Sequence, residues 1–184
     1  GNRVARVTQA NNGTWLEHFD ALITNEPGCA LTMNFADCTP IMLYDPVQQA
    51  IGLGHAGWKG AVVDLPGAMV RAMQQQFGSN PAELRAGIGP CISWENYEVD
   101  EPLVSEVKAV FADWATLLKK KESGGNGRYH FDLTEANRRN LARAGVRHIE
   151  LSGLCTAART DLFFSHRAER GKTGRFGSIF VLGK

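Results

Sequence analysis

The apolar residues of this chain fall into two kinds of segment: short runs bounded by turn residues, and longer stretches with helical spacing. A short apolar run next to glycine, proline, asparagine or aspartate is typical of a buried β-strand. Several of the predicted strands follow one another directly, which favours a mixed sheet over a purely parallel one. The predicted strands cover residues 3–8, 21–24, 30–34, 41–44, 50–53, 84–88, 148–151 and 178–182.

Three longer segments predict helices, at residues 59–77, 101–118 and 133–144. Asp64, Pro66 and Gly67 mark a break or a restart inside the first of them. After the second, the lysines at 119–121 and the glycine-rich residues 123–127 predict a solvated helix end followed by a loop. The expected fold class is α/β (α+β): a mixed β-sheet core flanked by helices, forming a single domain over residues 1–184.

The third predicted helix carries signals at both of its ends. Asp132 precedes the helix and can cap its free amide groups, and Glu135 is expected to complete a capping box. Gly145 follows the helix and can supply the left-handed residue that stops it.

Composition narrows the class of protein. The 20 basic and 19 acidic residues nearly cancel and no long basic run occurs, so we expect no nucleic-acid partner. No apolar stretch approaches the length of a membrane span, and no signal peptide is visible, so we expect no membrane partner. The four cysteines are widely spaced, which favours a reducing, cytoplasmic location.

The candidate chemistry centres on one cysteine and one histidine. Cys38 and His55 each lie in a short turn that follows an apolar run. A thiolate and an imidazole brought together at two strand ends are two of the ligands that a tetrahedral zinc site requires. The alternative is that both are buried structural residues, and the sequence pattern favours the metal site.

A glycine motif in the same region suggests a different function. Residues 52–57 read Gly-Leu-Gly-His-Ala-Gly, a literal G-x-G-x-x-G after a predicted strand, as in dinucleotide-binding proteins. The bulky His55 inside it, and the absence of an acidic residue after the next predicted strand, disfavour that interpretation. We expect instead that the glycines let the backbone turn sharply and direct His55 into a cleft.

A set of motifs along the whole chain supports the metal site. They are Asp20-Ala21-Leu22-Ile23-Thr24, Ala36-Asp37-Cys38-Thr39-Pro40, His55-Ala56-Gly57-Trp58-Lys59-Gly60, Gly87-Ile88-Gly89-Pro90-Cys91, Phe163-Phe164-Ser165-His166-Arg167 and Thr173-Gly174-Arg175. Together they resemble the laccase-domain family, also called multicopper polyphenol oxidoreductases. Many of its members are regarded as zinc-dependent purine nucleoside phosphorylases.

The resemblance implies a metal site of three protein ligands. Two of them correspond to Cys38 and His55, and the third is a histidine in a segment immediately before the one that Gly1 begins. We therefore expect an N-terminally truncated or naturally short form, which binds metal more weakly than a version extended through that histidine. The expected metal is zinc, with copper possible.

The resemblance also implies the substrates. The family is reported to cleave purine nucleosides such as adenosine and inosine with phosphate, and to deaminate adenosine. Asp37, Trp58, Lys59 and Arg167 are the candidate substrate or phosphate residues, as are the amide groups that follow His55. The oligomeric state stays open.

Three alternative functions remain. Polyphenol oxidation by a copper cluster is disfavoured because the chain has only five histidines, and no two of them lie two residues apart. A metal-independent hydrolase could use Cys38 as nucleophile and His55 as base. A non-enzymatic binding domain is the third alternative.

Overall fold

The computed structural model describes residues 1–120 and 128–183. Within them, a main sheet of six strands has the order β1-β2-β5-β4-β6-β10. The outer pairs β1–β2 and β6–β10 are parallel, and the three inner pairs are antiparallel. The mixed sheet predicted from the sequence is therefore confirmed. Its strands are β1 (Val4–Arg6), β2 (Ala21–Thr24), β4 (Thr39–Asp45), β5 (Ala50–Ala56), β6 (Arg85–Ile88) and β10 (His148–Leu151).

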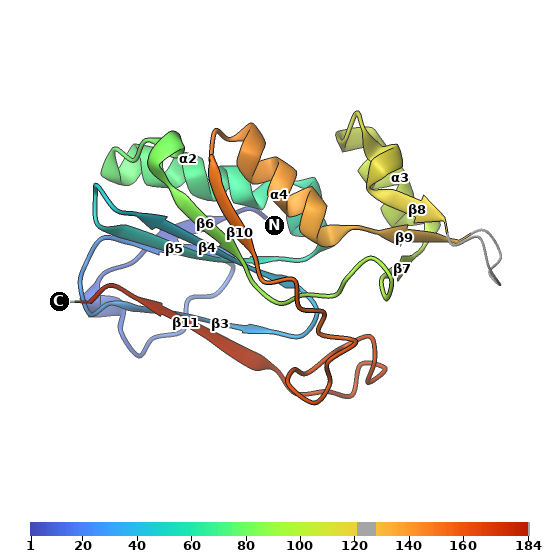
Figure 1. Ribbon diagram of the computed structural model, residues 1–184. Coiled ribbons are helices and arrows are strands. Elements are labelled where there is room, and N and C mark those ends of the chain that lie inside the picture. The colour runs from blue at the N-terminus through green and yellow to red at the C-terminus, as the bar shows by residue number, and fades with distance from the viewer. Residues whose placement is uncertain (121–127, 184) are drawn as a thin grey trace.

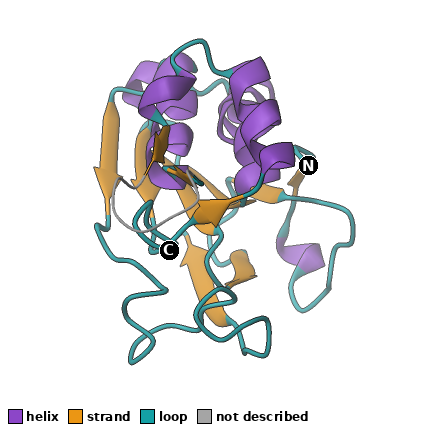
Figure 2. Cartoon of the chain, turned by 90° about the vertical axis from the view of Figure 1, so that its right-hand side faces the viewer, coloured by secondary structure: helices purple, strands orange, loops and turns teal. Residues whose placement is uncertain are grey.

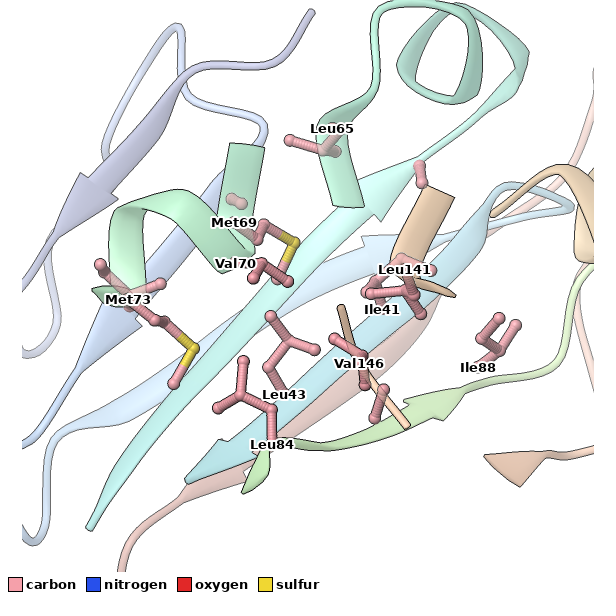
Figure 3. Close-up of a cluster of buried hydrophobic side chains, with 14 of the residues drawn as sticks. Ile41, Leu43, Leu65, Met69, Val70, Met73, Leu84, Ile88, Leu141 and Val146 are labelled. Atoms are coloured by element: carbon pink, nitrogen blue, oxygen red, sulfur yellow. The ribbon is translucent and has the colours of Figure 1, made fainter. Parts of the chain in front are cut away.

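Helices cover one face of the main sheet (Figure 1). The predicted break near Asp64 is confirmed, since α1 (Trp58–Val62) ends before it and α2 (Leu65–Phe77) begins after it. Asp64 itself is left-handed, with φ of 57°, and its carboxylate accepts a hydrogen bond from the amide of Gly67. Figure 3 shows the core that α2 and α4 (Leu133–Arg143) form with the sheet, with Met69, Met73 and Leu141 among its buried side chains.

The glycines of the G-x-G-x-x-G motif do not form a turn, which corrects the sequence-based expectation. Gly52 and Gly54 lie inside β5, beneath α2. A β-carbon on Gly54 would lie against the sulfur of Met69, and one on Gly52 would lie 3.2 Å from a methyl group of Ile23. These glycines therefore let α2 pack close to the sheet, and a dinucleotide loop is absent at this place.

A second layer covers the opposite face of the main sheet. It consists of β3 (Ala30–Phe35) and β11 (Phe176–Val181), an antiparallel pair in which Phe176 lies opposite Phe35. Buried side chains from both layers, including Leu31 and Leu53, fill the space between them. In Figure 2 the helices gather in the upper part of the molecule and the long loops in the lower part.

The predicted helix at residues 101–118 is wrong in its second half. Helix α3 covers Glu101–Val110 and ends at Phe111, whose backbone is extended. A short 3-10 turn and strand β8 (Leu118–Lys120) follow, so Lys119 and Lys120 lie in a strand and not at a helix end. Lys121 of the predicted helix end and the predicted loop at 123–127 lie outside the described residues.

Strand β8 belongs to a small antiparallel sheet that the sequence pattern did not predict. Its other strands are β7 (Glu98–Val99) and β9 (Tyr129–Phe131), in the order β7-β9-β8. Phe131 and Leu118 from this sheet pack with Leu103 and Val107 of α3 in a core of their own. Each of these strands has only two or three residues, too few to show an alternation of apolar and polar positions.

At the ends of α4, the predicted cap and the predicted stop residue are confirmed, and the predicted capping box is wrong. Asp132 caps the helix by accepting a hydrogen bond from the amide of Glu135, and Gly145 is left-handed with φ of 96°. The expected capping box does not form, because the Glu135 carboxylate binds Arg138 and Arg139 instead of the amide of Asp132. Within the described residues, no helix combines the length and apolar character needed to cross a membrane.

Candidate metal centre

The ends of β4 and β5 bring Cys38 and His55 to one face of the main sheet. In the antiparallel register Pro40 lies opposite His55 and Thr39 opposite Ala56, so Cys38 extends this pairing to Gly57. Alternate residues of a strand point to the same face, which places the thiol and the imidazole on the same side. Both side chains line one cavity of about 360 Å³.

Cys38 is held close to the neighbouring strand end. A β-carbon built on Gly57 would lie 2.8 Å from the Cys38 sulfur, so only glycine leaves room for the thiol there. Burial raises the pKa of Cys38 to about 11, and the nearby carboxylate of Asp37 acts in the same direction. Without a cation beside it, the thiol is therefore protonated at neutral pH.

His55 is fixed by stacking and by a backbone contact. Its ring lies on that of Phe35, with centroids 4.8 Å apart and planes 23° apart. Burial lowers the pKa of His55, while a hydrogen bond to the backbone of Asn34 opposes this shift. The imidazole is therefore neutral at pH 7. A neutral imidazole whose orientation is fixed by a backbone hydrogen bond is well suited to bind a metal.

Asp37 is buried, with φ of 81°, and joins three segments of the chain. One carboxylate oxygen accepts a hydrogen bond from the hydroxyl of Thr156 at 2.6 Å, and the other accepts one from the amide of Arg167 at 2.7 Å. Its carbonyl accepts a hydrogen bond from the amide of Ile92. Both carboxylate oxygens thus bind the protein itself, and Asp37 positions the loops around Cys38.

The other predicted residues divide between the cavity and its surroundings. Trp58 and Arg167 line the cavity, whereas Lys59 does not. The Lys59 amine lies 5.4 Å from the centre of the Trp58 ring. The Arg167 guanidinium donates a hydrogen bond to the carbonyl of Glu98 and lies over the ring of Tyr97. Helix α1, which provides the amide groups after His55, has five residues only.

The cavity also contains residues that sequence reasoning did not select for the site. Tyr97, His166 and Arg175 line it together with Cys38 and His55. His166 and Arg175 belong to motifs that were noted in the sequence, but nothing local showed that these motifs reach the cavity. They are brought there by the loops that precede β11.

The donor set fits a divalent metal in part. One thiol and one neutral imidazole are ligands that zinc accepts, and they share a cavity wall. In the part of the chain that the structure describes, no three histidine, cysteine, aspartate or glutamate side chains lie close enough together to hold an ion. Cys38 and His55 are thus a pair of donors that needs at least one further ligand.

Proteins of known sequence and structure match nearly the whole chain. Purine nucleoside phosphorylase YlmD of Bacillus subtilis is 42% identical over 97% of this chain, and that of Geobacillus stearothermophilus is 37% identical over 95%. The chain spans 66% of the length of each of these relatives.

Solved structures agree with these sequence matches. The structure of YlmD from Geobacillus stearothermophilus superimposes with a TM-score of 0.92 at 35% identity, over 100% of this chain and 71% of that one. A Bacillus licheniformis hypothetical protein, YfiH, gives a TM-score of 0.91 at 37% identity, over 98% of this chain and 70% of that one. The profile of one family matches residues 1–183. The chain therefore belongs to the family described as multi-copper polyphenol oxidoreductase laccase.

Proposed function

We propose that this chain provides the active site of a zinc-dependent purine nucleoside phosphorylase, which acts on adenosine, inosine and related nucleosides. The observation that carries the proposal is the pairing of Cys38 and His55 on one wall of a cavity that also contains arginine side chains. The relatives named purine nucleoside phosphorylase support it, since 37% to 42% of the residues are identical in the matched regions and the fold matches that of YlmD from Geobacillus stearothermophilus.

The reaction needs a nucleophilic phosphate, an electrophilic sugar carbon and a purine base that takes up a proton as it leaves. A phosphate oxygen forms a bond to C1′ of the ribose while the bond from C1′ to the purine nitrogen breaks. The base leaves with the electron pair and takes up a proton, and the second product is ribose 1-phosphate. A zinc ion held by Cys38 and His55 would supply Lewis-acid chemistry at the cavity wall.

The residues of the chain have distinct roles in this proposal. Cys38 and His55 would hold the metal, and the stacking of His55 on Phe35 would fix the orientation of its ring. Arg167 would bind phosphate through its guanidinium, and Trp58 would form a wall against the nucleoside. Asp37 would position the Cys38 turn and the Arg167 backbone together, since it binds the amide of Arg167. Lys59 lies outside the cavity lining, and we assign it no role in the reaction.

The same site would also deaminate adenosine if water replaced phosphate as the nucleophile. The oxygen of water would then form a bond to C6 of the purine, and the amino group would leave as ammonia. No part of this reaction needs the arginines, so the two activities would share Cys38 and His55 and differ in their need for the arginines. We propose deamination as a secondary activity of the site.

Two alternatives are less well supported. A cysteine hydrolase needs a thiolate at neutral pH, whereas burial raises the pKa of Cys38 to about 11. A multicopper oxidase needs many histidines, whereas His55 and His166 are the histidines that line the cavity in the described part of the chain.

Product analysis tests the proposed function. Protein expressed from the full coding sequence is incubated with inosine, with and without phosphate, and the products are separated by chromatography. We expect hypoxanthine and ribose 1-phosphate in equal amounts, formed only with phosphate. Cys38→Ala should abolish the reaction. Cys29→Ala, which removes a buried thiol outside the cavity, should retain it.

The opposite results would contradict the proposal. Cleavage that proceeds without phosphate would identify a hydrolase. A folded Cys38→Ala variant with undiminished turnover would show that the metal pair is not part of the site.

A further inference from the structure

Arg175 reaches the candidate metal centre through the pairing of β3 with β11. Phe176, the first residue of β11, lies opposite Phe35, the last residue of β3. Arg175 therefore precedes the strand at the level of Ala36, close to the turn that carries Cys38. Phe35 also stacks on His55, so the same strand end positions the imidazole and the arginine.

The backbone before Arg175 is held in place by its neighbours. A β-carbon on Gly174 would lie 2.9 Å from the ring of Phe164, so this ring packs directly against the glycine. The hydroxyl of Thr173 donates a hydrogen bond to the carboxylate of Glu169, which also accepts one from the amide of Ser165. The position of Arg175 is thus fixed by contacts on both sides of the loop.

The Arg175 guanidinium is only partly used by the protein. Its Nη1 donates hydrogen bonds to two carbonyls of its own loop, those of Thr173 and Gly174, the second at 2.7 Å. Among the described residues, Arg175 forms no ion pair with a carboxylate. The Nε and Nη2 edge is therefore free to bind an anion with two parallel N–H groups.

The charge of Arg175 affects the pKa values of both metal-ligand candidates, Cys38 and His55. Burial is the main cause of the lowered pKa of His55, and the Arg175 charge lowers it further. At Cys38, where burial raises the pKa, the Arg175 charge opposes that rise. The guanidinium thus lies within electrostatic range of both side chains, in the cavity that they share.

We propose that Arg175 is a phosphate-binding residue of this site and holds the phosphate dianion beside Cys38 and His55 through its Nε and Nη2 groups. This inference rests on the proposed phosphorolysis and adds to it a residue that binds the co-substrate. Arg167, whose guanidinium binds the carbonyl of Glu98 and lies over the ring of Tyr97, would be a second arginine at the phosphate.

Binding of inorganic phosphate to the metal-free protein tests the inference without any turnover. Titration calorimetry compares the wild type with Arg175→Met, Arg175→Lys and the control Lys172→Met, which removes an exposed charge from the same loop. Loss of a charge-assisted pair should weaken phosphate binding about tenfold to a hundredfold in Arg175→Met. The phosphate affinity of Arg175→Lys should lie between those of the wild type and Arg175→Met. A lysine keeps the charge but lacks the two parallel N–H groups of the guanidinium. Lys172→Met should bind as the wild type does.

Several outcomes would overturn the inference. Equal phosphate affinity in the wild type and a folded Arg175→Met variant would do so, as would the absence of measurable binding by the wild type. An equal loss in Arg175→Met and Lys172→Met would show a general charge effect. A loss of affinity for a nucleoside 5′-monophosphate, with inorganic phosphate unaffected, would assign Arg175 to a nucleotide and not to the co-substrate.

Nucleoside turnover separates this inference from the proposed function. If phosphate binding depends on Arg175 but inosine is not cleaved, the anion site stands and the proposed function fails. If inosine is cleaved and the KM for phosphate is unchanged in Arg175→Met, the proposed function stands and the inference about Arg175 fails.

Discussion

Gly57 controls how closely the Cys38 thiol approaches the end of β5. Because a β-carbon there would lie 2.8 Å from the sulfur, Gly57→Ala should displace the thiol from its place beside His55. We expect zinc affinity and turnover to fall about tenfold or more, with a loss of about 1–3 kcal/mol in the free energy of unfolding. Chelator competition and urea unfolding measure the two effects.

Gly60→Ala is the matched control for this substitution. The added methyl group would lie 3.6 Å from Leu65, an ordinary contact, and alanine favours the helix by up to about 1 kcal/mol. Its zinc affinity should equal that of the wild type. If Gly57→Ala also kept wild-type affinity, the thiol would not need its present position.

The reactivity of two thiols with iodoacetamide should differ in the metal-free protein. Burial raises the pKa of Cys38 to about 11. At Cys155 burial acts in the same direction, but hydrogen bonds from Ser93 and from the amides of Ala157 and Ala158 outweigh it, and the pKa is lowered. Cys155 should therefore be labelled first at pH 8, and the Cys38 rate should rise about tenfold per pH unit between pH 7 and 9.

Peptide mapping by mass spectrometry identifies the labelled residue at each pH. Cys155→Ser should remove the fast phase and leave the slow one. Faster labelling of Cys38 than of Cys155 at pH 8 would mean that the Cys38 thiol is ionised without a metal, and the cysteine hydrolase would then be the better proposal.

Local motifs were sufficient to predict that Cys38 and His55 lie together, and not sufficient to place Arg175 beside them. Cys38 directly precedes β4 and His55 lies in β5, not in the expected turn, and these two strands pair with each other as neighbours along the chain. Arg175 reaches the same cavity only because β11 pairs with β3, which lies near the other end of the sequence. The spacing of residues within a short window carries no information on such a distant pairing.

At the level of elements, α4 is stabilised by a carboxylate with two arginine partners. Hydrogen bonds from Arg138 are the main cause of the lowered pKa of Glu135, which falls to about 2, and Arg139 adds to it. A carboxylate with a lowered pKa in the folded protein stabilises it above its unfolded pKa, and this contribution disappears as the pH falls toward 2.

Glu135→Gln should therefore lower the free energy of unfolding by about 1 kcal/mol at pH 7, a value reduced by solvent screening at this half-buried site. The difference from the wild type should shrink between pH 5 and about 2. Glu106→Gln on α3, where the described residues provide no ion pair, should show little effect at any pH. A pH-independent difference in urea unfolding would show that the Glu135 charge is not the cause.

The sequence predicted long strands and capped helices well, and short strands poorly. Helix α4 carries its own cap and stop residues, so its limits follow from local chemistry. Helix α3 has no stop residue of this kind, and Leu117 and Leu118 continue its apolar spacing although they fill the core from outside the helix. The chain leaves α3 at Phe111, and Leu117 and Leu118 then share a core with Phe131 of β9, a contact that residues 101–118 alone do not reveal.

On the scale of the whole molecule, the cavity lies where the main sheet, the β3–β11 layer and the α3 region meet. Cys38 and His55 come from the main sheet, Arg175 from the end of the β3–β11 layer, and Tyr97 from the segment before β7. Asp37 joins these parts by accepting hydrogen bonds from Thr156 and Arg167. The site thus depends on the packing of all three parts, although its two metal-ligand candidates are local to one of them.

X-ray absorption spectroscopy at the zinc edge tests the central claim, that Cys38 and His55 bind one metal together. The protein is expressed from its full coding sequence, loaded with one equivalent of zinc and compared with Cys38→Ala and with Cys29→Ala. We expect one sulfur ligand at about 2.3 Å and imidazole nitrogen at about 2.0 Å in the wild type and in Cys29→Ala. The sulfur signal should be absent from Cys38→Ala. A zinc environment without sulfur in the wild type, or a sulfur ligand that persists in Cys38→Ala, would contradict joint binding of zinc by Cys38 and His55.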